Sequence, residues 1–412
     1  MRTLEISSLE SQTPEILRLI HSLLLALGKS MNVLFLDQTG QLGGAELSLL
    51  DLSQSFSKGS SVALFQDGPF RERLEEAGVR VEVIHNSVQP STKDSGILKG
   101  MLSFFSAFPL IRQISKRAKS YDCLYANTQK AFIFGAVASV ISGRPIVYHL
   151  RDILSTDYLS QTNLSVVTWF ANRCATIVIA NSEATEKAFI KAGGNAQKVK
   201  VVYKGFNPND YTRNDQSRKI LREQLGVSDR FVIGQFSRLS PWKGQHILLE
   251  ALKSTSDSTV ALFVGAALFG EDEYASQLEQ QVQTLGLGDR VKFLGFRSDV
   301  AELMQACDAI AHTSVTPEPF GRVIVEAMFS RRPVIATAAG GAIELIEPDK
   351  TGWLTEPGNA EDLTKAIHSI QQDAMVSDSI VQAAYAQAFD RFHIDSTNRQ
   401  IAMILNTIES TP

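Results

Sequence analysis

Short apolar, β-branched runs alternate with longer stretches of helical periodicity from Met31 to the end of the chain. This alternation is typical of parallel sheets that are covered by helices. The runs fall into two sets, and each set predicts one doubly wound α/β domain. The first set is 32–37, 61–66, 79–85, 123–128, 145–150 and 176–181, and the second is 231–237, 260–265, 291–296, 309–314 and 333–338.

The segment between the two sets, residues 203–217, is rich in Gly, Pro, Asn and Asp, which is the composition of a linker. We therefore predict an N-terminal domain at 31–205, a linker at 206–229, a C-terminal domain at 230–385 and a helical segment at 386–412. Open α/β sheets bind ligands at the carboxyl ends of their strands. Two such domains facing each other would share one ligand-binding cleft.

Residues 1–30 precede the first predicted strand and carry an apolar run at 16–27. That run is shorter than the roughly 18–20 residues that span a bilayer, and Arg18 and His21 interrupt it. No small-residue cleavage site of the signal-peptide kind follows it. The sequence leaves three interpretations open: an added helix, an over-long start of the chain, or an amphipathic helix on a membrane surface.

The overall composition narrows the class of partner. The chain of 412 residues has 40 basic and 44 acidic residues, a formal charge of -4, and therefore no general attraction for nucleic acid. Its three cysteines, Cys123, Cys174 and Cys307, are odd in number and far apart, which argues against a disulfide framework and against a metal cluster. We expect a cytoplasmic protein that binds no nucleic acid and no metal.

The strongest candidate for chemistry is the segment TPEPFGRVIVEAM, which contains Glu318 and Glu326. Glu318 precedes a Pro-Phe-Gly turn, and Glu326 lies about one turn into the predicted helix that follows. Gly321 and the free N–H groups of the first helical turn suit an anionic ligand. The two carboxylates suit hydroxyls of a sugar and of a ribose. By themselves, two glutamates at this spacing are more often an exposed loop residue and an ordinary helix residue.

A pair of basic residues, Arg238 and Lys243, flanks a turn between a predicted strand and a predicted helix. Two cations in such a loop could clamp a diphosphate, Arg through its planar fork and Lys as a point charge. They would also stabilise a nucleotide diphosphate as it leaves. The alternative is a solvated basic turn.

The first domain offers two further candidates. Gly43 and Gly44 form a glycine-rich turn between the first strand and a helix, where backbone can approach a phosphate or a sugar closely. This turn lacks the G-x-G-x-x-G pattern and the lysine of a P-loop, so a purely structural turn is the alternative. His149 and Arg151 stand at the carboxyl end of a predicted strand, and a core histidine is the alternative there.

Four segments, taken in order, resemble the retaining family 4 glycosyltransferases of the GT-B fold: GGAE at 43–46, RLSPWKG at 238–244, EPFGRVIVEAM at 318–328 and AAGGAIELI at 338–346. Each segment is a weak signal, but the ordered set is specific, and the resemblance covers about residues 31–400. It implies two Rossmann-like domains that face each other across a cleft, with a C-terminal helix that crosses back to the first domain.

The resemblance also implies a role for each candidate residue. Glu318 contacts the transferred sugar, Glu326 holds the ribose, and His149 lies beside the reacting centre. The implied catalytic residues are His149, Glu318, Arg238 and Lys243. The implied donor-binding residues are Arg238, Lys243, Glu318, Phe320, Gly321, Glu326, Gly295 and Phe296, while Gly43, Gly44 and Arg151 lie on the side of the acceptor or the phosphates.

By the same resemblance, we expect transfer of a sugar from a nucleotide diphosphate sugar, UDP- or GDP-linked, to an acceptor hydroxyl with retention of anomeric configuration. Neither a metal nor another cofactor is expected, because the two basic residues replace a divalent cation. The acceptor is a glycan or a lipid-linked molecule. Residues 97–116 are apolar and then basic, so they predict either contact with the cytoplasmic face of a membrane or a helix packed on the sheet, with Pro109 interrupting any single long helix.

Two departures from the family pattern stand out. Arg331 occupies a helix end where the family usually has glycine, and YKGFN at 203–207 replaces an asparagine-glycine pair. The rival interpretations are a GT-B epimerase or phosphorylase, a non-catalytic GT-B partner subunit, and a Rossmann dehydrogenase. The last of these lacks its G-x-G-x-x-G fingerprint here.

Overall fold

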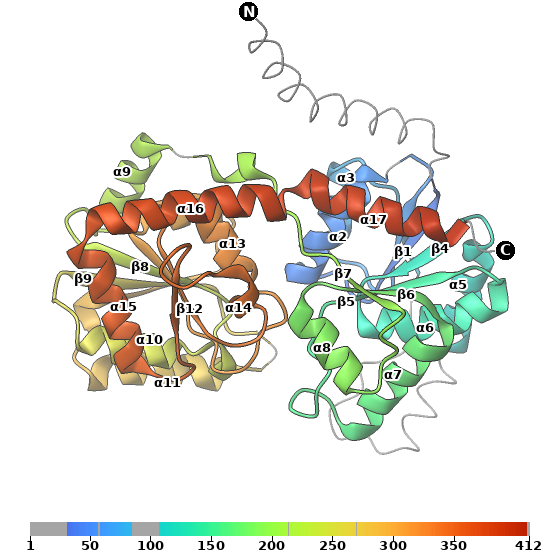
Figure 1. Ribbon diagram of the computed structural model, residues 1–412, viewed down its shortest axis with the longest axis horizontal. Helices are drawn as coiled ribbons and strands as arrows, with labels where there is room; N and C mark the ends of the chain where they lie inside the picture. Colours follow the sequence, from blue (N-terminus) through green and yellow to red (C-terminus); the bar gives the residue numbers. More distant parts are fainter. Residues whose placement is uncertain (1–30, 57, 85–106, 213, 269, 410–412) are drawn as a thin grey trace, which may run out of the picture.

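The computed structural model describes residues 31–409 except residues 57, 85–106, 213 and 269. Two parallel sheets lie in two units joined across the top by a pair of long helices (Figure 1). Alternate residues of each strand supply a hydrophobic core on each face of the sheet, which is what a doubly wound arrangement requires. The structure therefore has the predicted GT-B fold class.

The N-terminal unit has the strand order β3-β2-β1-β4-β5-β6-β7, all parallel. Its strands are β1 (Val33–Asp37), β2 (Ser61–Leu64), β3 (Val81–Val83), β4 (Cys123–Ala126), β5 (Ile146–Leu150), β6 (Ala175–Ala180) and β7 (Val199–Val201). Its helices are α2 (Gly44–Ser55), α3 (Pro69–Glu76), α5 (Phe108–Ala118), α6 (Gln129–Ser142), α7 (Gln161–Cys174) and α8 (Glu183–Lys191).

The C-terminal unit has the strand order β10-β9-β8-β11-β12-β13, again all parallel. Its strands are β8 (Phe231–Phe236), β9 (Thr259–Val264), β10 (Val291–Gly295), β11 (Ala309–His312), β12 (Val334–Thr337) and β13 (Trp353–Thr355). Its helices are α9 (Asp215–Gln224), α10 (Gln245–Lys253), α11 (Asp272–Thr284), α12 (Val300–Ala306), α13 (Arg322–Phe329), α14 (Ala342–Leu345), α15 (Ala360–Gln372) and α16 (Ala374–Phe392), with 3₁₀ turns η1 (Pro208–Tyr211), η2 (Pro241–Lys243) and η3 (Gly288–Arg290).

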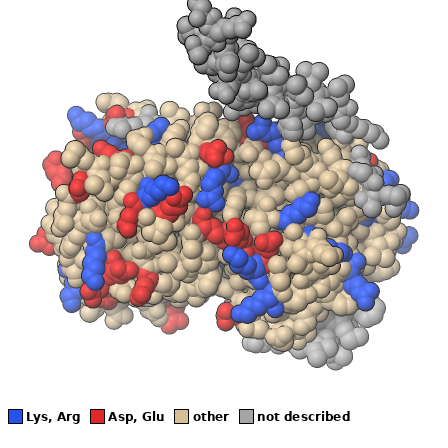
Figure 2. Space-filling view, in the orientation of Figure 1, with Lys and Arg blue, Asp and Glu red and all other residues tan. Residues whose placement is uncertain are grey.

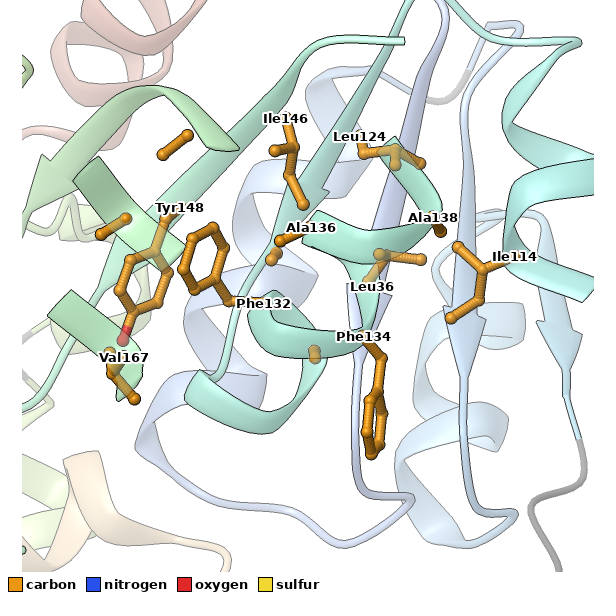
Figure 3. Packing of buried hydrophobic residues seen from close by; sticks show 14 of the residues in the cluster. Leu36, Ile114, Leu124, Phe132, Phe134, Ala136, Ala138, Ile146, Tyr148 and Val167 are labelled. Carbon is orange, nitrogen blue, oxygen red and sulfur yellow. The ribbon is translucent and has the colours of Figure 1, made fainter. Parts of the chain in front are cut away.

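The core of the N-terminal unit shows why these residues form these layers. Helix α6 lies against the sheet, and the ring of Phe132 stacks on that of Tyr148 with centroids 4.1 Å apart (Figure 3). Gly135 on the same helix lets it approach closely, because a Cβ at that position would come within 2.7 Å of the Leu36 Cδ1 atom. The helix is thus held against β1 and β5.

The chain crosses between the units twice, and the two crossings pair with each other. The Phe206 N–H donates to the Phe392 carbonyl at 2.8 Å, and the Ile394 N–H donates to the Phe206 carbonyl at 2.9 Å. Helix α16 then covers the C-terminal unit, whereas the next helix, α17 (Ile394–Glu409), lies on the N-terminal unit (Figure 1). Its buried residues Ile401 and Leu405 join the core beneath α2. The predicted crossing of the C-terminal helix is confirmed.

All eleven predicted strands are present, with ends within a few residues of the predicted ones. The sequence patterns missed β7 and β13, which have three residues each; β3 is equally short but was recognised from the longer run at 79–85. Helix α5 begins at Phe108 and has Pro109 in its first turn, where proline is tolerated, which agrees with the expectation that Pro109 does not stand inside a long helix. The extension 1–30 and the segment 97–106 lie outside the described residues.

Arg331 takes the left-handed conformation, with φ of 53°, just after α13. The Arg332 N–H donates to the Ala327 carbonyl and the Arg331 N–H to the Met328 carbonyl, so the helix ends in a Schellman motif. The Arg331 guanidinium lies 3.6 Å from the centroid of the Tyr385 ring and donates to Gln382. These contacts offset the strain of a side chain where the family usually has glycine.

The packing of α17 generates a test of the fold. Leu405 is fully buried in the core of the N-terminal unit. We therefore expect Leu405→Ala to lower the free energy of unfolding of that unit by about 2–5 kcal/mol. Met403→Ala on the same helix is the control, because Met403 is 40% exposed. Urea unfolding followed by circular dichroism checks this, and equal stabilities of the two variants would contradict it.

Candidate active site

The candidate residues gather where each sheet reverses its strand order. In the N-terminal unit the reversal lies between β1 and β4, and in the C-terminal unit it lies between β8 and β11. The loops that follow two strands at such a switch point run in opposite directions and leave a crevice. Gly43 follows β1, Arg238 and Lys243 follow β8, and Glu318 follows β11. The topology thus accounts for the positions of these four residues.

Glu318 lies at the centre of the C-terminal half of the site. Its Oε1 atom is 2.8 Å from Lys243 Nζ, and its Oε2 atom is 2.5 Å from His312 Nε2 and 2.9 Å from Ser314 Oγ. The side chain is only 15% exposed. Burial would raise the pKa of Glu318, but the charge of Lys243 and the hydrogen bonds from His312 and Lys243 lower it well below its usual range. Glu318 is therefore an ionised carboxylate.

The glycine pair after β12 fixes the backbone at Glu318. Gly340 has φ of 60°, and a Cβ there would overlap the backbone of Glu318. The Gly341 N–H donates to the Glu318 carbonyl at 2.8 Å. Only glycine allows this approach, so the AAGG segment acts as the support for the loop that carries Glu318.

The basic turn between β8 and α10 is organised around Trp242. Lys243 Nζ lies 4.1 Å from the centroid of the Trp242 ring, and the Arg238 guanidinium lies 5.6 Å from it. Arg238 Nη1 is also 3.6 Å from Glu271 Oε2. The left-handed Gly244, with φ of 68°, closes the turn and starts α10. Two cations are thereby brought to one face of the site, on a rigid turn.

Glu326 and Phe320 have environments that differ from that of Glu318. Glu326 Oε1 accepts from Arg322 Nε at 2.5 Å and from the Tyr211 hydroxyl at 3.2 Å, and the residue is 6% exposed. The Phe320 ring is buried in an aromatic cluster with Phe206 and two other rings. A ligand at this point would meet the backbone of residue 320 rather than its ring, and a ribose would share the Glu326 carboxylate with Arg322.

The other expected donor-binding positions lie at element ends. Gly321, with φ of 96°, precedes the first residue of α13. Gly295, with φ of 64°, ends β10, and its carbonyl accepts from the Gly265 N–H at 2.8 Å. Phe296 follows it and is 76% exposed, so its ring is available to a ligand.

His149 is the last residue but one of β5 in the N-terminal unit and is buried. Its Nδ1 atom accepts from Arg151 Nη2 at 3.1 Å and from the Tyr125 hydroxyl. Burial and the charge of Arg151 lower the pKa of His149 well below its ordinary value, so the ring is neutral and its proton is on Nε2. Nε2 has no hydrogen-bond partner within the described part of the chain. This N–H is the one polar group of the ring that a substrate could still use.

Arg151 is held in place by a chain of two hydrogen bonds that leads to β1 and to the end of β4. Its Nε atom donates to Asn127 Oδ1 at 2.8 Å, and Asn127 Nδ2 donates to Asp37 Oδ2 at 2.6 Å. Asp37 is completely buried, and burial raises its pKa. These hydrogen bonds connect the end of β5 to the two strands at the switch point and fix the Arg151 side chain. Arg151 in turn donates to His149 and fixes its ring.

The turn at Gly43 lies next to the buried carboxylate of Glu46. Gly43 precedes α2, and a Cβ there would lie 2.6 Å from Glu46 Oε2 in the first turn of that helix. Glu46 is 8% exposed, and burial together with the charge of Asp37 raises the pKa of Glu46 to about 7. Glycine at position 43 therefore makes room for Glu46.

Contacts between the units join the two halves of the site. Glu344 on α14 accepts from the N–H groups of Glu183 and Ala184, at 2.8 and 2.6 Å, and so caps α8 from the other unit. Tyr158 donates to the carbonyl of Pro317 at 2.8 Å, and Ser182 to that of Pro319. Figure 2 shows acidic and basic side chains gathered where the units meet.

Several residues of this site were missed from the sequence. His312, Ser314, Arg322 and Asn127 each contact a predicted residue or fix one. His312 carried a usable signal, because it lies near the carboxyl end of the predicted strand 309–314, as His149 lies near the end of 145–150. Arg322 stands four residues before Glu326, the spacing of a helical ion pair. Ser314 and Asn127 also lie in the last two positions of predicted strands, 309–314 and 123–128, so the same signal was available for them.

Neither a metal centre nor a membrane span is found among the described residues. No group of three or more His, Cys, Asp or Glu side chains there could hold a metal ion. No helix of that part of the chain is both long and apolar enough to cross a bilayer.

Two doubly wound units with polar groups at both switch points have the architecture of the GT-B class. The chain matches the model of Glycosyltransferase Family 4 over residues 42–210 and that of Glycosyl transferases group 1 over residues 217–387. It is 50% identical to HepE of Anabaena, with 91% of this chain and 99% of that chain covered and a TM-score of 0.85. The chain therefore belongs to the group 1, family 4 glycosyltransferases, and the fold and family predictions are confirmed.

HepE has been crystallised with UDP, with UDP and glucose, and with UDP-glucose. Among curated relatives, the chain is 31% identical to spore coat protein SA of Bacillus subtilis over 38% of this chain and 45% of that protein. It is 25% identical to the D-inositol 3-phosphate glycosyltransferase of Nocardioides over 86% of this chain and 83% of that enzyme. The matches to three of the curated relatives span about half of the length of those proteins.

The pKa of Glu46 generates a test of pH dependence. Its folded-state pKa of about 7 lies above the ordinary value of 4.5, so the folded state binds the proton more tightly than the unfolded state does. Stability should therefore fall as the pH rises from about 4.5 to 7, by an amount on the order of 2–3 kcal/mol. Glu46→Gln should remove this fall in urea unfolding between pH 5 and pH 8. Glu76→Gln is the control, because Glu76 lies at the exposed end of α3, and this variant should show the same fall of stability with pH as the wild type.

The Glu344 cap generates a test of the contact between the units. We expect Glu344→Ala to weaken that contact by about 0.5–2 kcal/mol, as the loss of a helix-capping side chain does. The radius of gyration from small-angle X-ray scattering should then rise. Glu347→Ala is the control, because Glu347 is exposed and pairs with Lys350. Identical scattering from both variants and the wild type would contradict the role of this contact.

Proposed function

We propose that this glycosyltransferase transfers a sugar from a UDP-sugar to an acceptor hydroxyl with retention of anomeric configuration. The observation that carries the proposal is the ionised Glu318 bound to Lys243 at the β8/β11 switch point. The likeness to HepE supports UDP as the nucleotide and makes UDP-glucose the first donor to test.

The proposed binding mode follows from the chemistry of each group. Arg238 and Lys243 hold the diphosphate, Glu326 accepts from the ribose hydroxyls, and Glu318 accepts from a hydroxyl of the sugar. Gly321 and the first N–H groups of α13 face the phosphates, where the positive end of a helix favours an anion. On the other side of the cleft, Gly43, Gly44 and Arg151 lie next to the phosphates or the acceptor, which we propose is a glycan or a lipid-linked molecule.

In the proposed reaction, the bond from the anomeric carbon to the phosphate oxygen breaks while a bond from that carbon to the acceptor oxygen forms on the same face. The acceptor proton passes to the departing diphosphate, whose charge Arg238 and Lys243 stabilise. Glu318 takes no part as an acid, because its pKa is held low. The neutral His149 offers its Nε2–H to an oxygen near the reacting centre. Two cations on one turn perform the task of a divalent metal, so the reaction requires none.

Substitution of the basic turn tests this assignment. We expect Lys243→Ala to reduce the rate of UDP release in the presence of acceptor by about 100- to 1000-fold, because it removes a group that stabilises developing charge. Arg238→Ala and Glu318→Ala should also lose activity. The control is Lys253→Ala at the exposed end of α10. Full activity in all three site variants would exclude the assignment.

The stereochemistry and the metal requirement are tested with the same enzyme. The proton NMR spectrum of the first product should show the anomeric configuration of the donor, and addition of EDTA should leave the rate unchanged. An inverted product would exclude retention, and a rate that EDTA abolishes and magnesium restores would exclude the metal-free mechanism. UDP release without transfer, or epimerisation of the donor, would favour a GT-B enzyme of other chemistry.

A further inference from the structure

His312 is the last residue of β11, the strand that borders the switch point of the C-terminal unit. It is 6% exposed, and the family motifs recognised in the sequence do not include it. A buried imidazole costs free energy unless its nitrogens find partners. The partners of His312 therefore indicate what the residue is for.

One nitrogen of His312 is used and the other is not. Nε2 lies 2.5 Å from Glu318 Oε2 and 3.3 Å from Ser314 Oγ. Because an ionised carboxylate only accepts hydrogen bonds, Nε2 carries the proton and donates it to Glu318. Nδ1 is buried without a hydrogen-bond partner within the described residues. The shorter of the two polar contacts of this ring is thus the one to Glu318.

The three donors to Glu318 come from different places in the chain. Lys243 approaches Oε1 from the turn after β8, whereas His312 and Ser314 approach Oε2 from the end of β11. An ionised carboxylate has about four acceptor positions, so three donors leave about one position unfilled. His312 belongs to β11, which pairs with β8 on one side and with β12 on the other, so its backbone is held by the sheet.

We propose that His312 is a positioning residue for sugar transfer: it holds the Glu318 carboxylate so that its remaining acceptor position receives one hydroxyl of the donor sugar. This inference rests on the proposed function, since it requires Glu318 to bind the sugar. It explains why a buried ring donates to a carboxylate that Lys243 already neutralises. UDP lacks the sugar, so His312 affects binding of UDP-glucose and leaves binding of UDP unchanged.

Calorimetric titration of UDP and of UDP-glucose, together with steady-state rates of UDP release, tests the inference. His312→Leu removes the donor, and we expect kcat/KM for UDP-glucose to fall at least about 10-fold, as loss of a hydrogen bond to a charged group does. Its Kd for UDP should stay within about 2-fold of the wild type, which also demonstrates that the variant is folded. His368→Leu on α15 is the matched control and should behave as the wild type.

Two polar substitutions distinguish loss of the hydrogen bond to Glu318 from a folding defect. The amide of His312→Gln reaches the position of Nε2 and should restore most of the activity, whereas the shorter amide of His312→Asn reaches only the position of Nδ1 and should not. Wild-type rates in His312→Leu and His312→Asn would overturn the role of His312. An equal loss of UDP and UDP-glucose binding in all three variants would also overturn it, because that result describes a structural residue.

A failure of the proposed function would look different. In that case the wild type itself would bind UDP-glucose no more tightly than UDP and release no UDP when acceptor is added. The inference about His312 would then fall together with the assignment of Glu318. If the wild type is active, the rates and Kd values of the His312 variants alone test the role of His312. A failure of this inference and a failure of the proposed function therefore give different results.

Discussion

The ion pair between Lys243 and Glu318 is the interaction on which the site depends. Two charges taken out of water lose more hydration energy than one contact returns, unless further hydrogen bonds complete the shell. Here His312 and Ser314 supply those bonds to the second oxygen of Glu318. The pair therefore forms only when the turn after β8, the end of β11 and the loop before α13 are all in place, and its formation couples three segments of the C-terminal unit.

The same loop is also a surface of contact with the other unit. The carbonyls of Pro317 and Pro319, on either side of Glu318, accept from Tyr158 and Ser182 of the N-terminal unit. Glu344 completes this contact by capping α8. A change in the angle between the units would alter the backbone next to Glu318, so closure of the cleft and the geometry of the carboxylate are linked in one segment of chain.

Much of the fold and part of the site could be predicted from the sequence, for a physical reason. Buried parallel strands are apolar runs, and switch-point loops follow strands directly, so Arg238, Lys243 and Glu318 could be placed after predicted strands and His149 near the end of one, whereas their predicted roles came from the family resemblance. The partners of these residues depend on tertiary packing. Phe320 illustrates the limit: its place in the motif suggested ligand contact, but its ring is buried among Phe206, Phe392 and Tyr203, which come from the two crossings between the units.

The two glutamates of one motif are held by different kinds of interaction, and this difference suits different tasks. Glu318 is bound by donors from two other segments, so its orientation cannot change unless those segments move. Glu326 accepts from Arg322, four residues earlier on the same helix, at 2.5 Å, and from the Tyr211 hydroxyl of η1 at 3.2 Å, so its shorter contact lies within α13 and can change by side-chain rotation. A carboxylate that must meet one sugar hydroxyl gains from the first arrangement. A carboxylate that must exchange partners as a nucleotide enters and leaves gains from the second, because α13 itself need not move.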